Sequence, residues 1–301
     1  MRFNKWCVHW LDLYKRRFIK ESTYSSYLFA CQHIKCKRKL EKLSIVDLQK
    51  VINDMIDKKL SLSTVKHTVT IMIQASRRAY SLGYCKQLDY SFLELPTDKK
   101  SKVEALSLSD QRLILSNIAL SFYGPFFKFL LFSGMRVGEA IALRWSAIDY
   151  KNKIIKIRYT DYRGTEQDTK TVNSCRDIPL TADLYNILQD NFKIGSVYCF
   201  TNTMGNKINY RSLLDSWHRF ILNIGVTPCG LHALRHTYAT NALKAGVNIK
   251  VLSEILGHKT VNITLNIYTD IDISDKAAAA ALLTDYIKDK VSNERKKIGV
   301  I

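Results

Sequence analysis

Apolar side chains recur at helical spacing through most of the first 90 residues. Trp6, Trp10 and Leu13 mark an expected helix over 3–18, because positions three to four residues apart share one face of a helix. Three further helices are expected, each after a Ser or Thr that can cap it: Ser22 or Thr23, Ser44, and Ser61 or Ser63. The pattern therefore predicts a bundle of four to five helices over 1–90.

A polar segment then interrupts the periodicity. The sequence LPTDKKSK at 95–102 contains proline and carries no apolar face, which is typical of a linker. We therefore place a domain boundary here: a first domain over 1–95, a linker over 96–104 and a second domain over 105–301. In the second domain we expect helices from Ser109 or Asp110, over 125–132, from Arg136, from Thr181 or Asp183, and over 210–224.

Strand signals are confined to the middle of the second domain. Residues 153–159 alternate, so that Ile155, Ile157 and Tyr159 would share one face. A returning strand is expected to carry Lys170, the small sheet is expected to end at Ile178, Pro179 and Leu180, and a further short strand is expected over 197–200. The fold class is therefore mainly α with a small β-sheet, an α+β arrangement.

Candidate chemistry is concentrated between residues 229 and 270, where the pattern predicts three short helices. They are expected over 232–245, over 248–256 and from Thr260 or Asn262 onward, with glycines ending the first two. His232 and Arg235 are three residues apart and would share a face. His258 follows the second helix, and Tyr268 would lie on the third.

These side chains suit a phosphodiester substrate. A guanidinium offers a fixed fork of donors for phosphate oxygens, and a histidine can move a proton near neutral pH. A tyrosine can act as a nucleophile, but with a pKa of about 10 it needs assistance. Taken singly, each has an ordinary alternative: Tyr268 is one of 16 tyrosines, and the histidines could cap helices or pack in a core.

The strings HALRHTYAT, LGHK and NIYTD, in that order, resemble the tyrosine recombinases, also called phage-type integrases. SGMRVGE, around Arg136, matches the family's first arginine motif, and Lys170, ahead of RDIPL, matches its hairpin lysine. The likeness covers about 105–275 with all motifs and 1–95 more loosely. It implies an N-terminal helical, SAM-like core-binding domain followed by a tyrosine-recombinase catalytic domain.

The resemblance implies how DNA would be cut. Tyr268 attacks a DNA phosphate and leaves a 3′-phosphotyrosyl link and a free 5′-hydroxyl. Arg136 and Arg235 hold the non-bridging oxygens, where charge builds in the transition state. His232 assists proton transfer from the tyrosine, and His258 hydrogen-bonds the phosphate. Neither a cofactor nor a metal is expected, because the phosphotyrosyl bond conserves energy and the arginines provide positive charge.

Two assignments keep alternatives. Lys170 is the expected general acid for the leaving 5′-oxygen, with Lys153 and Lys156 as competitors. Outside the family pattern it would be an exposed strand lysine. Glu139, one turn beyond the first arginine, could orient a catalytic residue or could be an ordinary acid in the first turn of a helix.

The net charge of the chain indicates what kind of partner it binds. The chain has 46 Lys and Arg against 27 Asp and Glu, a net charge of +19, which favours a polyanion such as nucleic acid. Both domains share the excess, although solubility alone could also explain a basic surface. The candidate phosphate contacts of the first domain are Lys35, Lys37, Arg38, Lys39, Arg77 and Arg78.

Other motifs set the cellular context. The seven cysteines are an odd number without any C-x-x-C pair, so they are expected to be reduced thiols in a cytoplasm. Charges interrupt residues 1–20, and no uncharged apolar run reaches membrane-spanning length, so neither a signal peptide nor a span is expected. No nucleotide-binding glycine motif occurs.

We therefore expect a site-specific DNA recombinase that works as a homotetramer on two double-stranded DNA sites, in a bacterial cytoplasm and at the nucleoid when bound to DNA. Accessory DNA-bending or directionality proteins are further partners that the resemblance allows. Integration or excision of a mobile element is the first choice of role. The alternatives are a DNA invertase, a dimer-resolving recombinase, a type IB topoisomerase and a non-catalytic repressor. Many relatives carry an arm-binding domain ahead of the core-binding segment, and none is expected here.

Overall fold

The structure is a computed structural model that describes residues 1–97, 105–162, 164–168, 175–192, 194–258, 260–265 and 284. The chain divides into two compact units, Met1–Lys102 and Val103–Ile301, which we call the N-terminal and C-terminal units. Helices dominate the described residues and the strands form two small antiparallel sheets, so the predicted α+β class is confirmed. No helix in this described part is long and apolar enough to cross a membrane.

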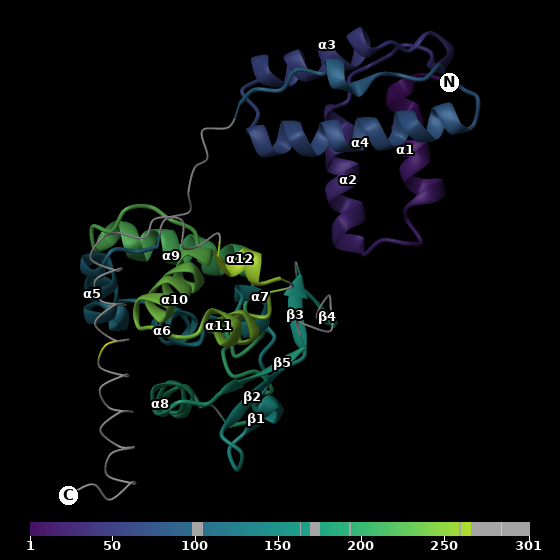
Figure 1. Cartoon of the computed structure of the whole chain (residues 1–301). Coiled ribbons are helices and arrows are strands. Elements are labelled where there is room, and N and C mark those ends of the chain that lie inside the picture. Colours follow the sequence, from purple (N-terminus) through teal and green to yellow (C-terminus); the bar gives the residue numbers. More distant parts are fainter. Residues whose placement is uncertain are drawn as a thin grey trace, which may run out of the picture. The chain divides into compact units, whose positions relative to one another are not determined.

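The N-terminal unit is a helical bundle. Its helices over 1–97 are α1 (Phe3–Tyr14), α2 (Glu21–His33), α3 (Ile45–Asp57) and α4 (Leu62–Ser81), with short 3-10 turns at Leu40–Lys42 and Tyr90–Phe92. α1 and α2 pack together, α4 crosses both, and α3 lies along α4 (Figure 1). Trp6 and Trp10 are buried at the centre, and the Trp6 indole donates a hydrogen bond to the Ala75 carbonyl at 2.8 Å.

The caps of this unit follow local chemistry, with two corrections. Ser44 and Asp47 form a reciprocal capping box at α3, and Ser61 caps α4. α2, however, begins at Glu21 without a side-chain cap rather than after Ser22 or Thr23. α1 ends at Tyr14 instead of residue 18, because the chain turns there and the next backbone amides bond back to Leu11 and Lys15.

The helices of the C-terminal unit pack around α6, which is largely buried and apolar except at Lys128 and Ser133. Its described helices are α5 (Leu108–Ser116), α6 (Gly124–Ser133), α7 (Val137–Ile141), α8 (Ala182–Asp190), α9 (Tyr210–Asn223), α10 (His232–Lys244), α11 (Ile249–Leu256) and α12 (Val261–Leu265). α6 contacts α8 and α10 (Figure 1). Phe126, Phe127 and Trp217 are fully buried in this core, and each such side chain contributes roughly 1.5–3 kcal/mol of burial free energy.

The strands lie at one side of these helices (Figure 1). β1 (Ile148–Asp149), β2 (Ile154–Ile157) and β5 (Arg176–Pro179) form one antiparallel sheet in the order β1-β2-β5. β3 (Tyr159–Tyr162) and β4 (Thr165–Asp168) form a separate hairpin.

The predicted continuous strand over 153–159 is therefore wrong in part. Ile155 and Ile157 are buried as expected, but Tyr159 is 45% exposed. The chain passes from one sheet to the other at Arg158, whose guanidinium donates to the carbonyls of Ile157 and Arg176.

Two other local predictions fail for identifiable reasons. α5 is capped by Ser107, whose hydroxyl accepts from the Asp110 amide at 3.1 Å, rather than by Ser109 or Asp110. Residues 197–200 form only an isolated bridge, between Tyr198 and Arg144, so the apolar run there packs without a sheet.

Candidate active site

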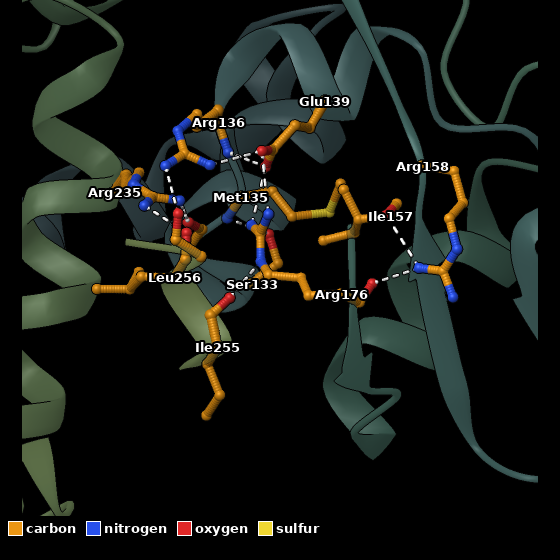
Figure 2. Close-up of polar contacts among 12 residues, drawn as sticks. Ser133, Met135, Arg136, Glu139, Ile157, Arg158, Arg176, Arg235, Ile255 and Leu256 are labelled. Atoms are coloured by element: carbon orange, nitrogen blue, oxygen red, sulfur yellow. Dashed lines mark hydrogen bonds and ion pairs between the residues drawn. The ribbon is translucent and has the colours of Figure 1, made fainter. Parts of the chain in front are cut away.

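The candidate site lies where the C-terminal end of α11 meets the start of α7 (Figure 2). Three consecutive carbonyls at this helix end each accept a hydrogen bond from a different arginine. Arg176 Nε donates to Ile255 at 2.5 Å, Arg235 Nη2 to Leu256 at 2.6 Å, and Arg136 Nη2 to Gly257 at 2.8 Å. The last carbonyls of a helix lack hydrogen-bond donors within the helix and carry partial negative charge. Positively charged guanidinium groups therefore bind favourably at this end.

Local sequence produces that helix end. Asn248 caps the start of α11, and Gly257 ends the helix in the left-handed conformation with φ of 64°. Glycine adopts this conformation without the steric cost that other residues meet. The backbone then turns and places His258 directly after the three carbonyls.

Arg136 stands at the N-cap position of α7. The Glu139 carboxylate accepts from its backbone amide at 2.9 Å and from its Nη1 at 2.8 Å. Glu139 therefore caps the helix and also orients the arginine. It is both an acid in the first turn of a helix and a residue that orients another side chain, the two alternatives that the sequence left open. The Arg136 side chain remains 36% exposed, so its guanidinium is open to a ligand.

Arg235 is held more tightly. It is buried in α10 and also donates to the Gly134 carbonyl at 2.7 Å. Gly134 has φ of 63°, and a Cβ there would lie 2.4 Å from the Tyr238 ring, so glycine is required at this close approach. Burial and the positive charge of Arg136 lower the pKa of Arg235 to about 9, which leaves the group charged at neutral pH.

Both predicted histidines border this positive cluster. Burial, followed by the charges of Arg235 and Arg136, lowers the pKa of His258 to about 4. Burial of part of its ring and the charge of Arg235 also lower the pKa of His232, at the first position of α10. The two imidazoles are therefore neutral at pH 7, and a neutral imidazole can both accept and donate a hydrogen bond.

His258 has a partner that the sequence analysis did not single out. Its Nδ1 lies 2.8 Å from the hydroxyl of Thr264, which is fully buried on α12. α12 begins directly after Thr260, one of its two predicted caps. The contact ties the histidine to the helix that precedes Tyr268 by three residues in the sequence.

Two of the predicted residues, Lys170 and Tyr268, lie outside the described residues. Of the competitors to Lys170, Lys156 forms an ion pair with Asp149 at 3.0 Å on the three-stranded sheet. Lys153 lies in the turn before β2 with φ of 54°. Within the described ranges, no three His, Cys, Asp or Glu side chains are grouped so that they could hold a metal ion.

The candidate DNA contacts of the N-terminal unit fall into two groups. Lys35, Lys37, Arg38 and Lys39 line one groove of about 570 Å³ together with Arg2, Lys42 and Lys50. Arg77 and Arg78 lie instead on α4, where they stack on Tyr90 and Tyr14 with cation-to-centroid distances of 5.2 and 4.7 Å.

Arg176 contacts the candidate site, but the sequence analysis did not include it among the candidate site residues. Its strand alternates between buried and exposed positions, with Arg176 and Ile178 buried. A charged residue at an inward position of an alternating strand is the signal that could have identified it, because buried charges need partners.

Comparison with known proteins identifies the family of the chain. The Phage integrase family model matches residues 110–274, which is more than half of the chain. The chain therefore belongs to the phage integrase family, and the resemblance stated from its motifs is confirmed. Its enzyme class is that of the tyrosine-type site-specific recombinases.

Two curated relatives illustrate the range of similarity. A XerC-like tyrosine recombinase of Caldanaerobacter subterraneus subsp. tengcongensis is 28% identical over 282 residues, which cover 82% of this chain and 72% of the relative. The integrase of Staphylococcus phage L54a is 29% identical over 163 residues, covering 46% of this chain and 45% of that protein. The match thus spans less than half the length of the phage integrase.

Solved structures share the fold. The Tn1549 transposon integrase in complex with transposon right end DNA has a TM-score of 0.80 at 19% identity, over 94% of this chain and all of that one. A lambda integrase tetramer bound to a Holliday junction has a TM-score of 0.74 at 16% identity, over 91% and 81% of the two chains. At these identities the likeness concerns the fold.

Proposed function

We propose that the protein cleaves and rejoins double-stranded DNA at specific sites through a 3′-phosphotyrosyl intermediate on Tyr268. The observation that carries the proposal is the convergence of Arg136, Arg235 and two neutral histidines at the end of α11. Such a cluster presents positive charge and proton acceptors at one place, which phosphoryl transfer requires.

The arginines bind the scissile phosphate. A guanidinium has five N–H donors, and the contacts of Arg235 to Gly134 and Leu256 engage only two of its nitrogens. The remaining donors and the exposed part of Arg136 can hold the two non-bridging oxygens, where charge grows in the transition state. This positive charge serves the purpose that metal ions serve in other phosphoryl-transfer enzymes.

Protons move at two oxygens during cleavage. The Tyr268 oxygen forms a bond to phosphorus as His232 takes its proton, because a neutral histidine is a suitable base. The bond from phosphorus to the 5′-oxygen breaks as Lys170 gives that oxygen a proton. His258 donates a hydrogen bond to the phosphate. Rejoining reverses these steps with a 5′-hydroxyl from the same or another duplex.

Residues 1–95 act as the core-binding domain in this proposal. The groove lined by Lys35, Lys37, Arg38 and Lys39, and the stacked Arg77 and Arg78 of α4, provide cations for the DNA backbone. Stacking on an aromatic ring restrains an arginine before DNA arrives, so less side-chain entropy is lost on binding.

Strand exchange between two duplexes calls for four subunits, two on each site, in the cytoplasm of a bacterium. We propose integration or excision of a mobile element as the role, since solved structures with this fold include a transposon integrase bound to transposon DNA. Inversion and dimer resolution use the same chemistry and are the alternative roles. The XerC-like relative is named a tyrosine recombinase, a name that fits each of these roles.

A nicked suicide duplex tests the proposal. Fragments from the DNA that flanks the gene are labelled and incubated with the full chain, and products are separated on denaturing gels. We expect a covalent protein–DNA adduct on the 3′-phosphate side of the cut and recombinant products with a second duplex. Binding without an adduct would indicate a repressor, and relaxation of supercoils without recombinants would indicate a topoisomerase.

A further inference from the structure

Arg176 is a buried arginine next to the candidate site that the proposed reaction does not use. It begins β5, and its side chain is 6% exposed. Its Nη1 and Nη2 bind the two Glu139 oxygens at 3.0 and 2.8 Å, and its Nε donates to the Ile255 carbonyl at 2.5 Å (Figure 2). One guanidinium thus joins β5, α7 and the end of α11.

The Glu139 carboxylate is therefore shared between two arginines. Arg136 contacts it with a backbone amide and one guanidinium nitrogen, while Arg176 covers both oxygens with its own pair of nitrogens. Burial raises the pKa of Glu139, but the hydrogen bonds and charges of Arg176 and Arg136 outweigh it and lower the pKa overall. Glu139 accordingly carries a full negative charge beside the phosphate-binding arginine.

That negative charge has a consequence for Arg136. If Arg176 were absent, a buried carboxylate would have Arg136 as its only cationic partner among these contacts. A buried ion needs a close counterion, so Glu139 would draw the Arg136 guanidinium inward and cancel its charge. Arg136 would then have less attraction to offer a phosphate.

We propose that Arg176 is a positioning residue that neutralises Glu139, so that Arg136 keeps its charge and its orientation toward the scissile phosphate. The inference rests on the proposed function and adds a residue to it. Arginine suits this position better than lysine, because its planar fork covers both carboxylate oxygens and leaves Nε for the Ile255 carbonyl.

A pair of DNA substrates separates this role from a contribution to folding alone. The two suicide duplexes differ only at the scissile linkage, which is either a phosphodiester or an uncharged methylphosphonate. Loss of charge from a non-bridging oxygen reduces the need for a free Arg136 guanidinium. We expect Arg176→Met to slow strand cleavage of the phosphodiester on the order of 10–10²-fold, as a loss of roughly 1.4–2.8 kcal/mol of transition-state stabilisation would, and to slow cleavage of the methylphosphonate far less.

Two variants serve as controls. Arg158→Met removes an arginine of the same strand region whose guanidinium binds Asp177 and the carbonyls of Ile157 and Arg176 instead of Glu139; any loss should be equal on both substrates. The double variant Arg176→Met with Glu139→Gln removes both buried charges, so neither is left buried without its partner. It should cleave the phosphodiester faster than Arg176→Met alone, because glutamine cannot neutralise Arg136.

The outcomes are distinct. An equal loss on both substrates, or no loss with either, would overturn the proposal for Arg176, as would a double variant that is no faster than the single one. Thermal unfolding of each variant identifies any that fails to fold, and the double variant then carries the test. If the unmodified protein cleaves neither duplex, the proposed function itself fails, whatever Arg176 does.

Discussion

Several charged side chains contact or border the backbone carbonyls of residues 255–257. Three guanidinium groups contact the end of one helix, and two of them also contact the Glu139 carboxylate. Burial, followed by the positive charge of the neighbouring arginines, lowers the pKa of His232 and of His258, since both effects disfavour the charged imidazole. At the residue scale the candidate site is therefore a cluster of positive charge bordered by two neutral imidazoles.

The nucleophile is the first assignment to test at this scale. Tyr268→Phe should abolish covalent attachment and leave DNA binding nearly unchanged, because only the attacking oxygen is lost. Denaturing gels measure the adduct and gel shifts measure binding. Tyr238→Phe is the matched control and should still form the adduct, since burial raises the pKa of Tyr238. A shifted band from the Tyr268 variant would disprove the assignment.

The assignment of Lys170 as the general acid predicts how cleavage depends on the leaving group. A 5′-alkoxide needs a proton as its bond breaks, and in the proposed reaction the donors of Arg136 and Arg235 are assigned to the non-bridging oxygens. Lys170→Ala should slow cleavage on the order of 10²–10⁴-fold, yet cleave a 5′-bridging phosphorothiolate at near the unmutated rate, because a thiolate leaves without protonation. Arg136→Ala should not be rescued by sulfur. If Lys170→Ala is not rescued either, Lys156 or His232 is tested next.

The depressed pKa of His258 predicts a pH dependence of stability. The unfolded chain takes up a proton as pH falls through about 6.5, whereas the folded protein resists until about 4. The contribution of His258 to the free energy of unfolding is therefore present above pH 6.5 and is lost as pH falls toward 4. Urea midpoints between pH 8 and 4.5 should decline less steeply for His258→Gln, and equal slopes would contradict the prediction.

At the scale of elements, α12 is coupled to the site through one hydroxyl. Thr264 is buried and contacts His258 Nδ1, and a hydroxyl that donates to Nδ1 leaves the ring proton on Nε2, where it can face a phosphate. The position of the helix ahead of Tyr268 and the tautomer of His258 are thereby linked.

Thr264→Val tests this link, because valine keeps the shape and loses the hydroxyl. Cleavage of saturating DNA should slow roughly fivefold, as expected for about 1 kcal/mol from one hydrogen bond. Thr264→Ser keeps the hydroxyl and should cleave at close to the normal rate. Single-turnover kinetics measure both, and identical rates for the valine and serine variants would argue for a packing role only.

At the scale of the whole molecule, the net charge of +19 predicts strong electrostatics in DNA binding. If about six to ten phosphates are neutralised, affinity should fall roughly 10³–10⁵-fold between 50 and 200 mM salt. Titrations by fluorescence anisotropy measure the slope. A flat response would contradict contact by both units, and loss of cleavage in excess EDTA would point to a metal-dependent nuclease instead.

Much of the molecule was determined by the sequence itself, wherever the signal is local. The helices over 232–244 and 249–256 were predictable because Gly246, Asn248 and Gly257 act on the helix ends within a few residues. The family followed from the order of its motifs along the chain, and the positions of Arg136, Arg235 and His258 within those motifs made them candidate site residues.

Only the tertiary structure determined which of those residues contact one another. Whether Arg136 contacts Gly257, 121 positions away, depends on the packing of α7 against the end of α11. The same packing brings Arg176 onto Glu139 and lowers the pKa of His232 and of His258. Hydrogen bonds and burial depend on distance in space, and the periodicity of a sequence reports only which face of its own helix or strand a residue occupies.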